Sequence, residues 1–258
     1  MDIAAGAPYP PDTPQAPEVS GRRIDWTPKD VLIGVLLFMG VFLILPLPVV
    51  VPLAVLFDSD SRPYLVISII ASAPIYLAIA WIAVRMSFGK YGGGWGRLGV
   101  QRITGRTLLW AAIAFAGAFT VSILYGVIIE AAHLDFLKQE CADQVPENIR
   151  SDAVLLAMSS FLAVLFAPVC EELYFRGFVF PGLARAWGPA AGIAASGILF
   201  GSAHLLGNPT LYKSMIQFSA IGMVFAYAYW KSGNIVSTML AHFTFNLIGI
   251  VTIASTTC

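Results

Sequence analysis

Long apolar runs dominate the pattern of hydrophobic and polar positions along this chain. A helix needs about 20 apolar residues to cross the hydrocarbon core of a bilayer, and seven runs are of that order. They cover residues 31–57, 64–86, 107–130, 153 to about 185, 189–206, 214–230 and 235–255. The predicted fold class is therefore all-α, a polytopic transmembrane helix bundle of seven or eight helices.

Prolines decide between the two counts. Pro46, Pro48 and Pro52 lie in the first run, and Pro168 and Pro181 lie in the fourth. Proline removes a backbone donor and kinks or breaks a helix, although neighbouring groups in a membrane protein can satisfy the carbonyls that it frees. An eighth helix follows if either run splits.

Composition supports the membrane assignment and excludes other classes. Hydrophobic residues make up 58% of the chain and charged residues 12%, far from the balance of a soluble domain. A formal net charge of +0 excludes a strongly basic surface for nucleic acid, so the expected partner of the surface is membrane lipid. Residues 1–30, rich in proline and alanine, are predicted to be a disordered cytoplasmic tail, followed by N-terminal transmembrane helices over 31–130.

Lysine and arginine predict the orientation. With the amino terminus in the cytoplasm, eleven of them lie in cytoplasmic segments and four in outside segments, which satisfies the positive-inside rule. The eleven are Arg22, Arg23, Lys29, Arg85, Lys90, Arg97, Arg102, Arg106, Arg176, Arg185 and Lys231, and the four are Arg62, Lys138, Arg150 and Lys213. The chain is predicted to be a multi-pass protein of the cell's inner or plasma membrane with a cytoplasmic amino terminus.

A few polar side chains interrupt the apolar runs of the C-terminal half. An ionisable residue near the bilayer centre is costly unless it faces protein or water, so each one is a functional candidate. The candidates are Glu171, Glu172, Arg176, His204, His242 and, as a neutral companion, Asn246.

The two glutamates are predicted to have different partners. Neighbouring residues on a helix point about 100° apart, so the carboxylates of Glu171 and Glu172 face different ways. Glu172 and Arg176 are four residues apart and share a face, which favours a charge-compensated pair. Glu171 is left as the unpaired, reactive carboxylate.

Sequence spacing places His204 opposite Glu171. A turn is predicted at Gly188-Pro189, with Glu171 lying 17 residues before Gly188 and His204 lying 16 residues after it. In an antiparallel hairpin the two side chains therefore meet at nearly the same height.

His242 and Asn246 share a face of the last run because they are four residues apart. His242 lies only nine residues past the turn at Gly233. That is shallower than the first pair, unless residues 176–185 project beyond the membrane.

Small residues line the run over 189–206, and Gly197 and Gly201 have the GxxxG spacing. Such residues let helix backbones approach closely in a membrane. This feature is interpreted as helix packing without a further role.

Three motifs follow one another on successive predicted helices: Glu-Glu-xxx-Arg over 171–176, Phe-xxx-His over 200–204 and His-xxx-Asn over 242–246. Over about residues 150–250 the chain resembles the CPBP family, also called the Abi family, of CAAX prenyl protease type II and bacteriocin-processing enzymes. The resemblance implies a catalytic region over 150–255 in a bundle of about eight helices, with a water-filled cavity open to the cytoplasm. The implied activity is that of an intramembrane endopeptidase acting on a peptide or membrane-protein substrate.

The resemblance also implies roles for the motif residues. Glu171 is the general base, and His204 helps to hold and polarise the attacking water. His242 and Asn246 stabilise the tetrahedral oxyanion, a role for which an amide and an imidazole N–H are suitable donors.

Zinc is the alternative to a site without a cofactor. Glu171, His204 and His242 could supply three ligands and leave the fourth position to water. Glu172, a supporting residue by resemblance, would then have to be the base, although its pairing with Arg176 opposes that role. A metal-free site, in which Arg176 orients the glutamates, avoids this conflict and is favoured.

Two other functions stay open. A non-proteolytic membrane scaffold or immunity protein of the same fold would bind a partner without cleaving it. A proton or metal transporter would use Glu171, His204 and His242 as a relay. Nor does the resemblance imply a prenylated substrate, since many bacterial relatives have none.

Overall fold

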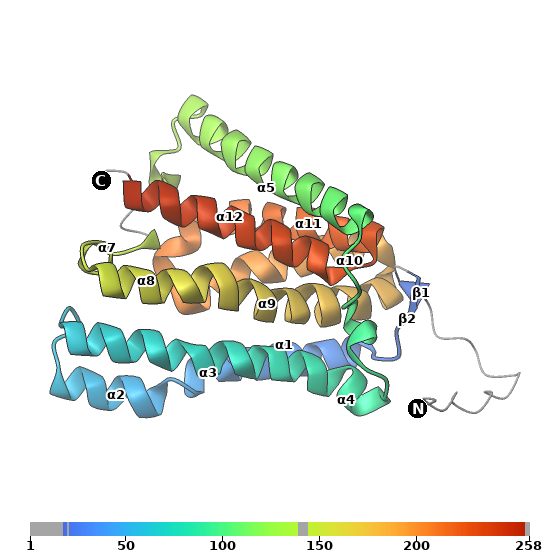
Figure 1. Cartoon of the computed structure of the whole chain (residues 1–258), viewed down its shortest axis with the longest axis horizontal. Coiled ribbons are helices and arrows are strands. Elements are labelled where there is room, and N and C mark those ends of the chain that lie inside the picture. Colours follow the sequence, from blue (N-terminus) through green and yellow to red (C-terminus); the bar gives the residue numbers. More distant parts are fainter. Residues whose placement is uncertain (1–17, 20, 139–143, 256–258) are drawn as a thin grey trace, which may run out of the picture.

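The computed structural model describes residues 18–19, 21–138 and 144–255, and most of this part of the chain is helical. The long helices lie side by side along one axis of the molecule (Figure 1). In that view α1 (Pro28–Ile44), α2 (Leu47–Leu56) and α3 (Arg62–Met86) lie on the lower side, and α5 (Gly105–Ala131) lies on the upper side. The predicted all-α membrane bundle is confirmed, whereas the count of seven or eight helices stays a prediction.

The remaining elements complete the bundle. The connecting elements are α4 (Phe88–Tyr91), η1 (Trp95–Leu98), η2 (Asp135–Leu137), α7 (Glu147–Arg150) and η5 (Pro209–Ser214). The C-terminal half consists of α8 (Ala153–Phe161), η3 (Leu162–Phe166), α9 (Ala167–Glu172), η4 (Leu173–Val179), α10 (Phe180–Gly207), α11 (Met215–Ser232) and α12 (Ile235–Ser255), in which η3 and η4 are π-helical. Two short antiparallel strands, β1 (Glu18–Val19) and β2 (Arg22–Arg23), precede α1.

Five segments of the described chain are long and apolar enough to cross a membrane. They are Pro28–Leu56, Arg62–Tyr91, Gly105–Ala131, Ala153–Leu206 and Ile235–Ser255. These segments support an integral membrane protein. The predicted run over 214–230 forms α11, which packs against α5 and α10.

Proline acts differently in the two runs that contain it. In the first run α1 ends at Ile44 and α2 begins at Leu47, with Pro46 as the residue that caps α2. In the fourth run the chain stays helical through Pro168 and Pro181. The predicted break therefore occurs in the first run. The fourth run stays helical, and the chain reverses after it, at Gly188.

Gly188 reverses the chain within the segment labelled α10. Its backbone lies at φ 81° and ψ 164°, a region that glycine adopts without a steric penalty. Beyond it the chain runs antiparallel to the preceding helix, since a Cβ on Gly192 would lie 2.8 Å from Cα of Ala184. The Ser196 hydroxyl donates to the carbonyl of Phe175 at 3.2 Å. The predicted hairpin turn is confirmed.

The small residues of α10 bring its backbone against that of α11. A Cβ on Gly197 would lie 2.7 Å from the carbonyl oxygen of Ser219, and one on Gly222 would lie 2.9 Å from Cα of Gly197. Such an approach replaces the hydrophobic effect, which is absent between helices in lipid, with close van der Waals packing. The interpretation of the GxxxG spacing as packing is confirmed.

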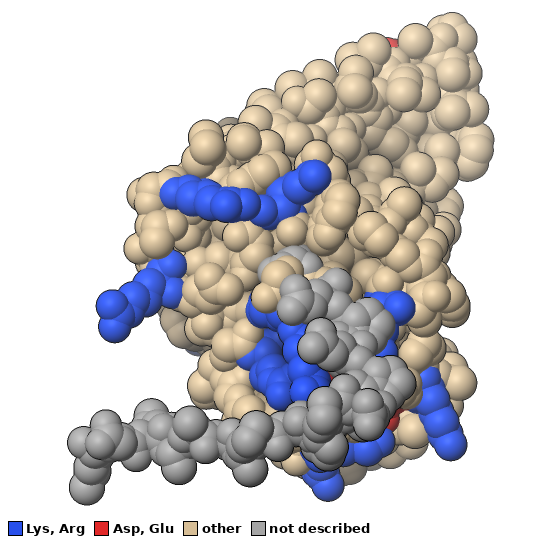
Figure 2. All heavy atoms as spheres, turned by 90° about the vertical axis from the view of Figure 1, so that its right-hand side faces the viewer, with Lys and Arg blue, Asp and Glu red and all other residues tan. Residues whose placement is uncertain are grey.

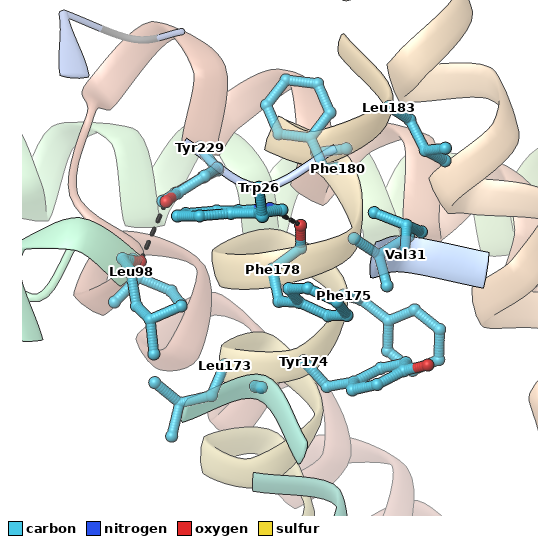
Figure 3. Close-up of a cluster of buried hydrophobic side chains, with 14 of the residues drawn as sticks. Trp26, Val31, Leu98, Leu173, Tyr174, Phe175, Phe178, Phe180, Leu183 and Tyr229 are labelled. Carbon is cyan, nitrogen blue, oxygen red and sulfur yellow. Dashed lines mark hydrogen bonds between the residues drawn. The ribbon is translucent and has the colours of Figure 1, made fainter. Parts of the chain in front are cut away.

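Residues 21–27, here called the N-terminal anchor, pack on the last turns of the continuous helix that runs from α8 to the turn at Gly188. Ile24 and Trp26 are buried, and the Trp26 indole donates to the carbonyl of Phe178 at 2.8 Å (Figure 3). Arg185 donates to the backbone carbonyl of Asp25 at 2.6 Å. The described part of the predicted disordered tail is therefore ordered, because two large apolar side chains give it a core to join; residues 1–17 and 20 lie outside the described residues.

The loop between α3 and α5 is fixed to the end of α11. Leu98 is buried, and its carbonyl accepts a hydrogen bond from the Tyr229 hydroxyl at 2.9 Å (Figure 3). Gly99 follows at φ 87°, and a Cβ there would lie 2.6 Å from the Tyr229 hydroxyl. The Gly99 carbonyl accepts from the backbone N–H of Ile235 at 2.9 Å, so this loop sets where α12 begins.

Positive charge gathers at the end of the bundle that carries the N-terminal anchor, here called the basic end. Figure 2 faces this end and shows Lys and Arg across it. By their places at helix ends and connecting loops, its members are Arg22, Arg23, Lys29, Arg85, Lys90, Arg97, Arg102, Arg106, Arg185 and Lys231. Arg176, counted above as cytoplasmic, is instead fully buried inside the bundle.

The opposite end carries a mixed set of charges. Its Lys and Arg are Arg62, Lys138, Arg150 and Lys213, and its described acidic residues are Asp58, Asp60, Glu130, Asp135, Glu147 and Asp152. Arg62 and Asp152 pair at 2.7 Å, which joins the start of α3 to the start of α8. The hydrogen bond from Arg62, with those from the N–H groups of Leu155 and Val154, holds the pKa of Asp152 below its ordinary value.

Replacing Gly197 by Leu should separate α10 from α11. The side chain has no space beside Ser219, so overpacking should lower the free energy of unfolding by about 1–3 kcal/mol. Thermal unfolding in detergent measures the effect. The matched control is Gly126→Leu on the exposed side of α5, where a Cβ meets nothing within 4 Å; equal stability of the two variants would contradict the close approach.

Candidate active site

A π-helical turn precedes the two glutamates and frees one backbone carbonyl. The N–H of Ala167 bonds to Leu162, five residues back. The next residue, Pro168, has no N–H, so the carbonyl of Ala163 loses the partner that this pattern would supply. The amide of Asn246 on α12 donates to this carbonyl at 2.8 Å. Proline thus creates the acceptor that holds Asn246 in place.

The adjacent glutamates lie in different surroundings, as their helical offset predicts. Glu172 is fully buried, and its carboxylate lies 3.0 Å from the Arg176 guanidinium. The Glu171 side chain is 15% exposed and faces a cavity. The predicted pair of Glu172 and Arg176 is present, and no ion pair of Glu171 with an arginine occurs among the described residues.

Arg176 ties the glutamate helix to its neighbours. It donates to the carbonyl of Gly222 on α11 at 3.2 Å. Its guanidinium carbon lies 4.3 Å from the ring centroid of Phe200 and 5.3 Å from that of Phe225. Aromatic faces attract a desolvated guanidinium, and the ring of Phe175 lies at 6.0 Å as well. The buried charge is therefore surrounded by one carboxylate, one carbonyl and three aromatic rings.

His242 lies between the two carboxylates. Its Nδ1 is 3.1 Å from the Glu172 carboxylate and its Nε2 is 4.0 Å from that of Glu171. An ionised carboxylate only accepts hydrogen bonds, so Nδ1 carries the proton that Glu172 receives. The Nε2 atom is left to face Glu171, at a distance that exceeds a direct hydrogen bond.

His204 is oriented by its own helix. Its Nδ1 lies 2.8 Å from the carbonyl oxygen of Phe200 and must donate to it, because a carbonyl only accepts. The ring lies between those of Phe200 and Phe218, at centroid distances of 4.8 and 4.5 Å. In the neutral ring, Nε2 is therefore an acceptor.

These groups line one cavity of about 320 Å³. Its polar lining includes Glu171, His204, His242 and Asn246, four of the six predicted site residues, together with Tyr76, Gln144 and Ser159. Glu172 and Arg176 do not line the cavity. They pair with each other, and Glu172 also contacts His242. The cavity continues along α8 and the C-terminal half of α12 toward the segment that precedes α8; its apolar lining includes Val145, Ile149, Ile221, Phe245, Ile250 and Ile253.

His242 can reach the two glutamates because the helix that carries them continues well beyond Glu172. Phe180 packs against Tyr229, at a ring-centroid distance of 6.0 Å, close to where α12 begins. The turns from Phe180 to Trp187 therefore extend past the start of α12, under the N-terminal anchor. This is the projection on which the predicted meeting of His242 with the glutamates depended.

Two expectations about the cavity exclude each other. The resemblance implies an opening to the cytoplasm, and the positive-inside rule places the basic end there. The cavity, however, extends toward residues 145–149, at the opposite end of the bundle.

Several cavity residues escaped the sequence analysis. Tyr76 comes from α3, and Val145, Pro146 and Ile149 come from the segment before α8. No polar motif marks these positions, because they are ordinary residues of an apolar helix and a loop. Only the three-dimensional arrangement shows that they line the same cavity as Glu171.

The three proposed zinc ligands do not form a preorganised metal site. Glu171, His204 and His242 line the same cavity, yet the described residues contain no group of three His, Cys, Asp or Glu placed to hold one ion. Zinc ligands lie about 2.0–2.2 Å from the ion, so these side chains would have to move to bind it.

The fold and the site together define a helical membrane protein with a buried glutamate and histidine centre. Residues 153–248 match the family model described as type II CAAX prenyl endopeptidase Rce1-like. The match covers all six predicted site residues, confirms the resemblance over this part of the chain and supports a protease. It does not indicate the bacteriocin-processing branch. No curated protein and no solved structure matches the chain.

Replacing Arg176 by Ala should destabilise the whole bundle. It leaves Glu172 buried without its cation, at a cost of about 3–5 kcal/mol in the free energy of unfolding. Removing the charge as well, in Glu172→Gln with Arg176→Ala, should restore part of that stability. Melting temperatures in detergent measure both effects, and a double variant no more stable than Arg176→Ala would remove the pair from the account of stability.

Proposed function

We propose that this protein is an intramembrane endopeptidase in which Glu171 activates the water that hydrolyses a peptide bond. The observation that carries the proposal is that Glu171, His204, His242 and Asn246 line one cavity inside the bundle. Charged groups in a membrane interior rarely gather without a function. The Rce1-like family match supports the same class of activity.

Glu171 is the base because it is the carboxylate that faces the cavity without an arginine partner. It takes a proton from water, whose oxygen attacks the carbonyl carbon of the substrate. His204 presents an acceptor at Nε2, so it can receive the second water proton in a hydrogen bond and orient the lone pair. The proton held by Glu171 then passes to the leaving amine as the peptide bond breaks.

Asn246 is the first donor to the tetrahedral oxyanion. Its amide carries two hydrogens, and one of them is used on the carbonyl of Ala163, which leaves the other for the substrate oxygen. His242 can donate from Nε2 only as the imidazolium, because Nδ1 already donates to Glu172. In that form Glu171 and Glu172 are its negative partners, at 4.0 and 3.1 Å.

The substrate class is a peptide or a membrane protein. The cavity walls beyond the polar groups are mostly apolar, which suits a hydrophobic peptide segment that enters from the bilayer or from the adjoining loop. Membrane lipid surrounds the bundle, since large apolar side chains are exposed along its helices. Prenylation of the substrate is not part of the proposal.

Replacing Glu171 by Gln should reduce proteolysis at least about 100-fold, because the change removes the base and keeps the volume. The measurement compares membrane-associated peptides between cells with the wild-type chain and cells with the variant. The variant should unfold at nearly the wild-type temperature in detergent.

The matched control for this comparison is Glu130→Gln, which changes an exposed carboxylate at the end of α5. It should leave the peptide pattern unchanged. Identical peptide patterns in wild-type and Glu171→Gln cells, with both proteins folded, would favour a non-proteolytic scaffold.

Activity should survive removal of metal ions. Elemental analysis of purified active protein, with peptide hydrolysis assayed before and after dialysis against a chelator, tests this. The expected result is less than one zinc per chain and unchanged turnover. Stoichiometric zinc, with activity lost on removal and restored by zinc, would instead assign ligand roles to Glu171, His204 and His242.

A further inference from the structure

Among the described residues, the lining of the cavity extends from the candidate site toward one end of the bundle. Along α12 the cavity is lined from His242 to Ile253, close to the C-terminal end of that helix. Along α8 and η3 it is lined by Ser159 and Ala163, which lie between the start of α8 at Ala153 and Glu171. On α10 it is lined by His204, which lies three residues before that helix ends at Gly207.

The basic end is closed over the same site. Between Glu172 and that end lie the aromatic layers of the core, including Phe178, Phe180 and Tyr229, all with no exposed surface. The N-terminal anchor covers these layers through Trp26 (Figure 3). No residue at the basic end, among those described, lines the cavity.

Charge still separates the two ends of the bundle after Arg176 is assigned to the core. Moving Arg176 from the cytoplasmic count into the core leaves ten Lys and Arg at the basic end and four at the opposite end. At the opposite end, six described acidic residues outnumber the four basic ones. Lys and Arg in short loops and near helix ends decide orientation, so the basic end is the cytoplasmic one.

We propose that the site opens on the extracytoplasmic side of the membrane, so that its substrates are apolar peptide segments presented from that side. A segment that enters between α7 and α12 meets apolar walls, including Ile149, Phe245 and Ile250, before its backbone reaches Glu171. These walls offer few polar partners, so an apolar chain is the one that loses least on entry. The choice of substrate rests on the proposed function, whereas the direction of access rests on cavity and charge alone.

Cysteine labelling tests the direction of access without any assay of catalysis. Cys141, Cys170 and Cys258 are first replaced by alanine, and a single cysteine is placed at Ser159 in the cavity wall. Among the described residues, the Ser159 hydroxyl bonds to carbonyls of its own helix. Serine and cysteine differ only by oxygen and sulfur, so the change should leave the wall nearly unaltered. A small sulfonated methanethiosulfonate, which does not cross membranes, is applied to intact cells and to inside-out vesicles.

Two exposed positions serve as matched controls, Ser59→Cys at the end opposite the basic end and Lys29→Cys at the basic end. Ser159→Cys and Ser59→Cys should be labelled in intact cells, and Lys29→Cys only in inside-out vesicles. Labelling of Ser159→Cys in vesicles alone would overturn the proposal. Its protection on both sides, in a folded protein, would overturn the proposal too, because the cavity would have no opening at this end.

The peptide comparison then separates the two proposals. Cleavage sites lost in Glu171→Gln cells should lie in segments exposed outside the cytoplasm. Lost sites confined to cytoplasmic segments would overturn extracytoplasmic access while leaving the proteolytic function intact. If no sites are lost, the proteolytic function fails, and the labelling pattern still decides the direction of access.

Discussion

The arrangement of the bundle depends on one buried pair of opposite charges, Glu172 and Arg176. In a bilayer an isolated charge costs several kcal/mol, so neither side chain is tolerated without the other. Together they reach three further helices: Arg176 contacts Gly222 on α11 and Phe200 on α10, and Glu172 contacts His242 on α12. The pair therefore sets the relative positions of the helices that line the cavity, although it does not line the cavity itself.

This arrangement divides the work of two neighbouring carboxylates. The charge of Glu172 is compensated by Arg176. Glu171 instead faces the cavity and lies 4.0 Å from the Nε2 atom of His242. The same division orients the donors, since Glu172 fixes the ring of His242 and the π-helical turn holds Asn246 through Ala163. In the proposed mechanism, the reactive Glu171 is thus distinct from the groups that hold the site in place, as preorganised sites require.

The sequence predicted the parts of this structure that depend on local spacing. Glu172 and Arg176 are four residues apart, and Glu171 and His204 lie 17 and 16 residues from Gly188. Regular helix and hairpin geometry turns both spacings into spatial proximity. The π-helical turns were not predictable from hydrophobic periodicity, because Pro168 frees a carbonyl whose new partner, Asn246, is 83 residues away in the sequence. Nor could Tyr76 be assigned to the site, since an apolar helix does not reveal which of its faces meets a neighbour.

The N-terminal anchor has a consequence for biosynthesis. Trp26 leaves the ribosome early, yet its hydrogen-bond partner Phe178 follows 152 residues later. Chains are made at roughly 5–20 residues per second, so about 8–30 s pass before the carbonyl that accepts the hydrogen bond of the indole is synthesised. The first helices must therefore enter the bilayer before the anchor can cover the basic end. Docking of the anchor can then come only late in assembly, after the helix that carries the glutamates has been inserted.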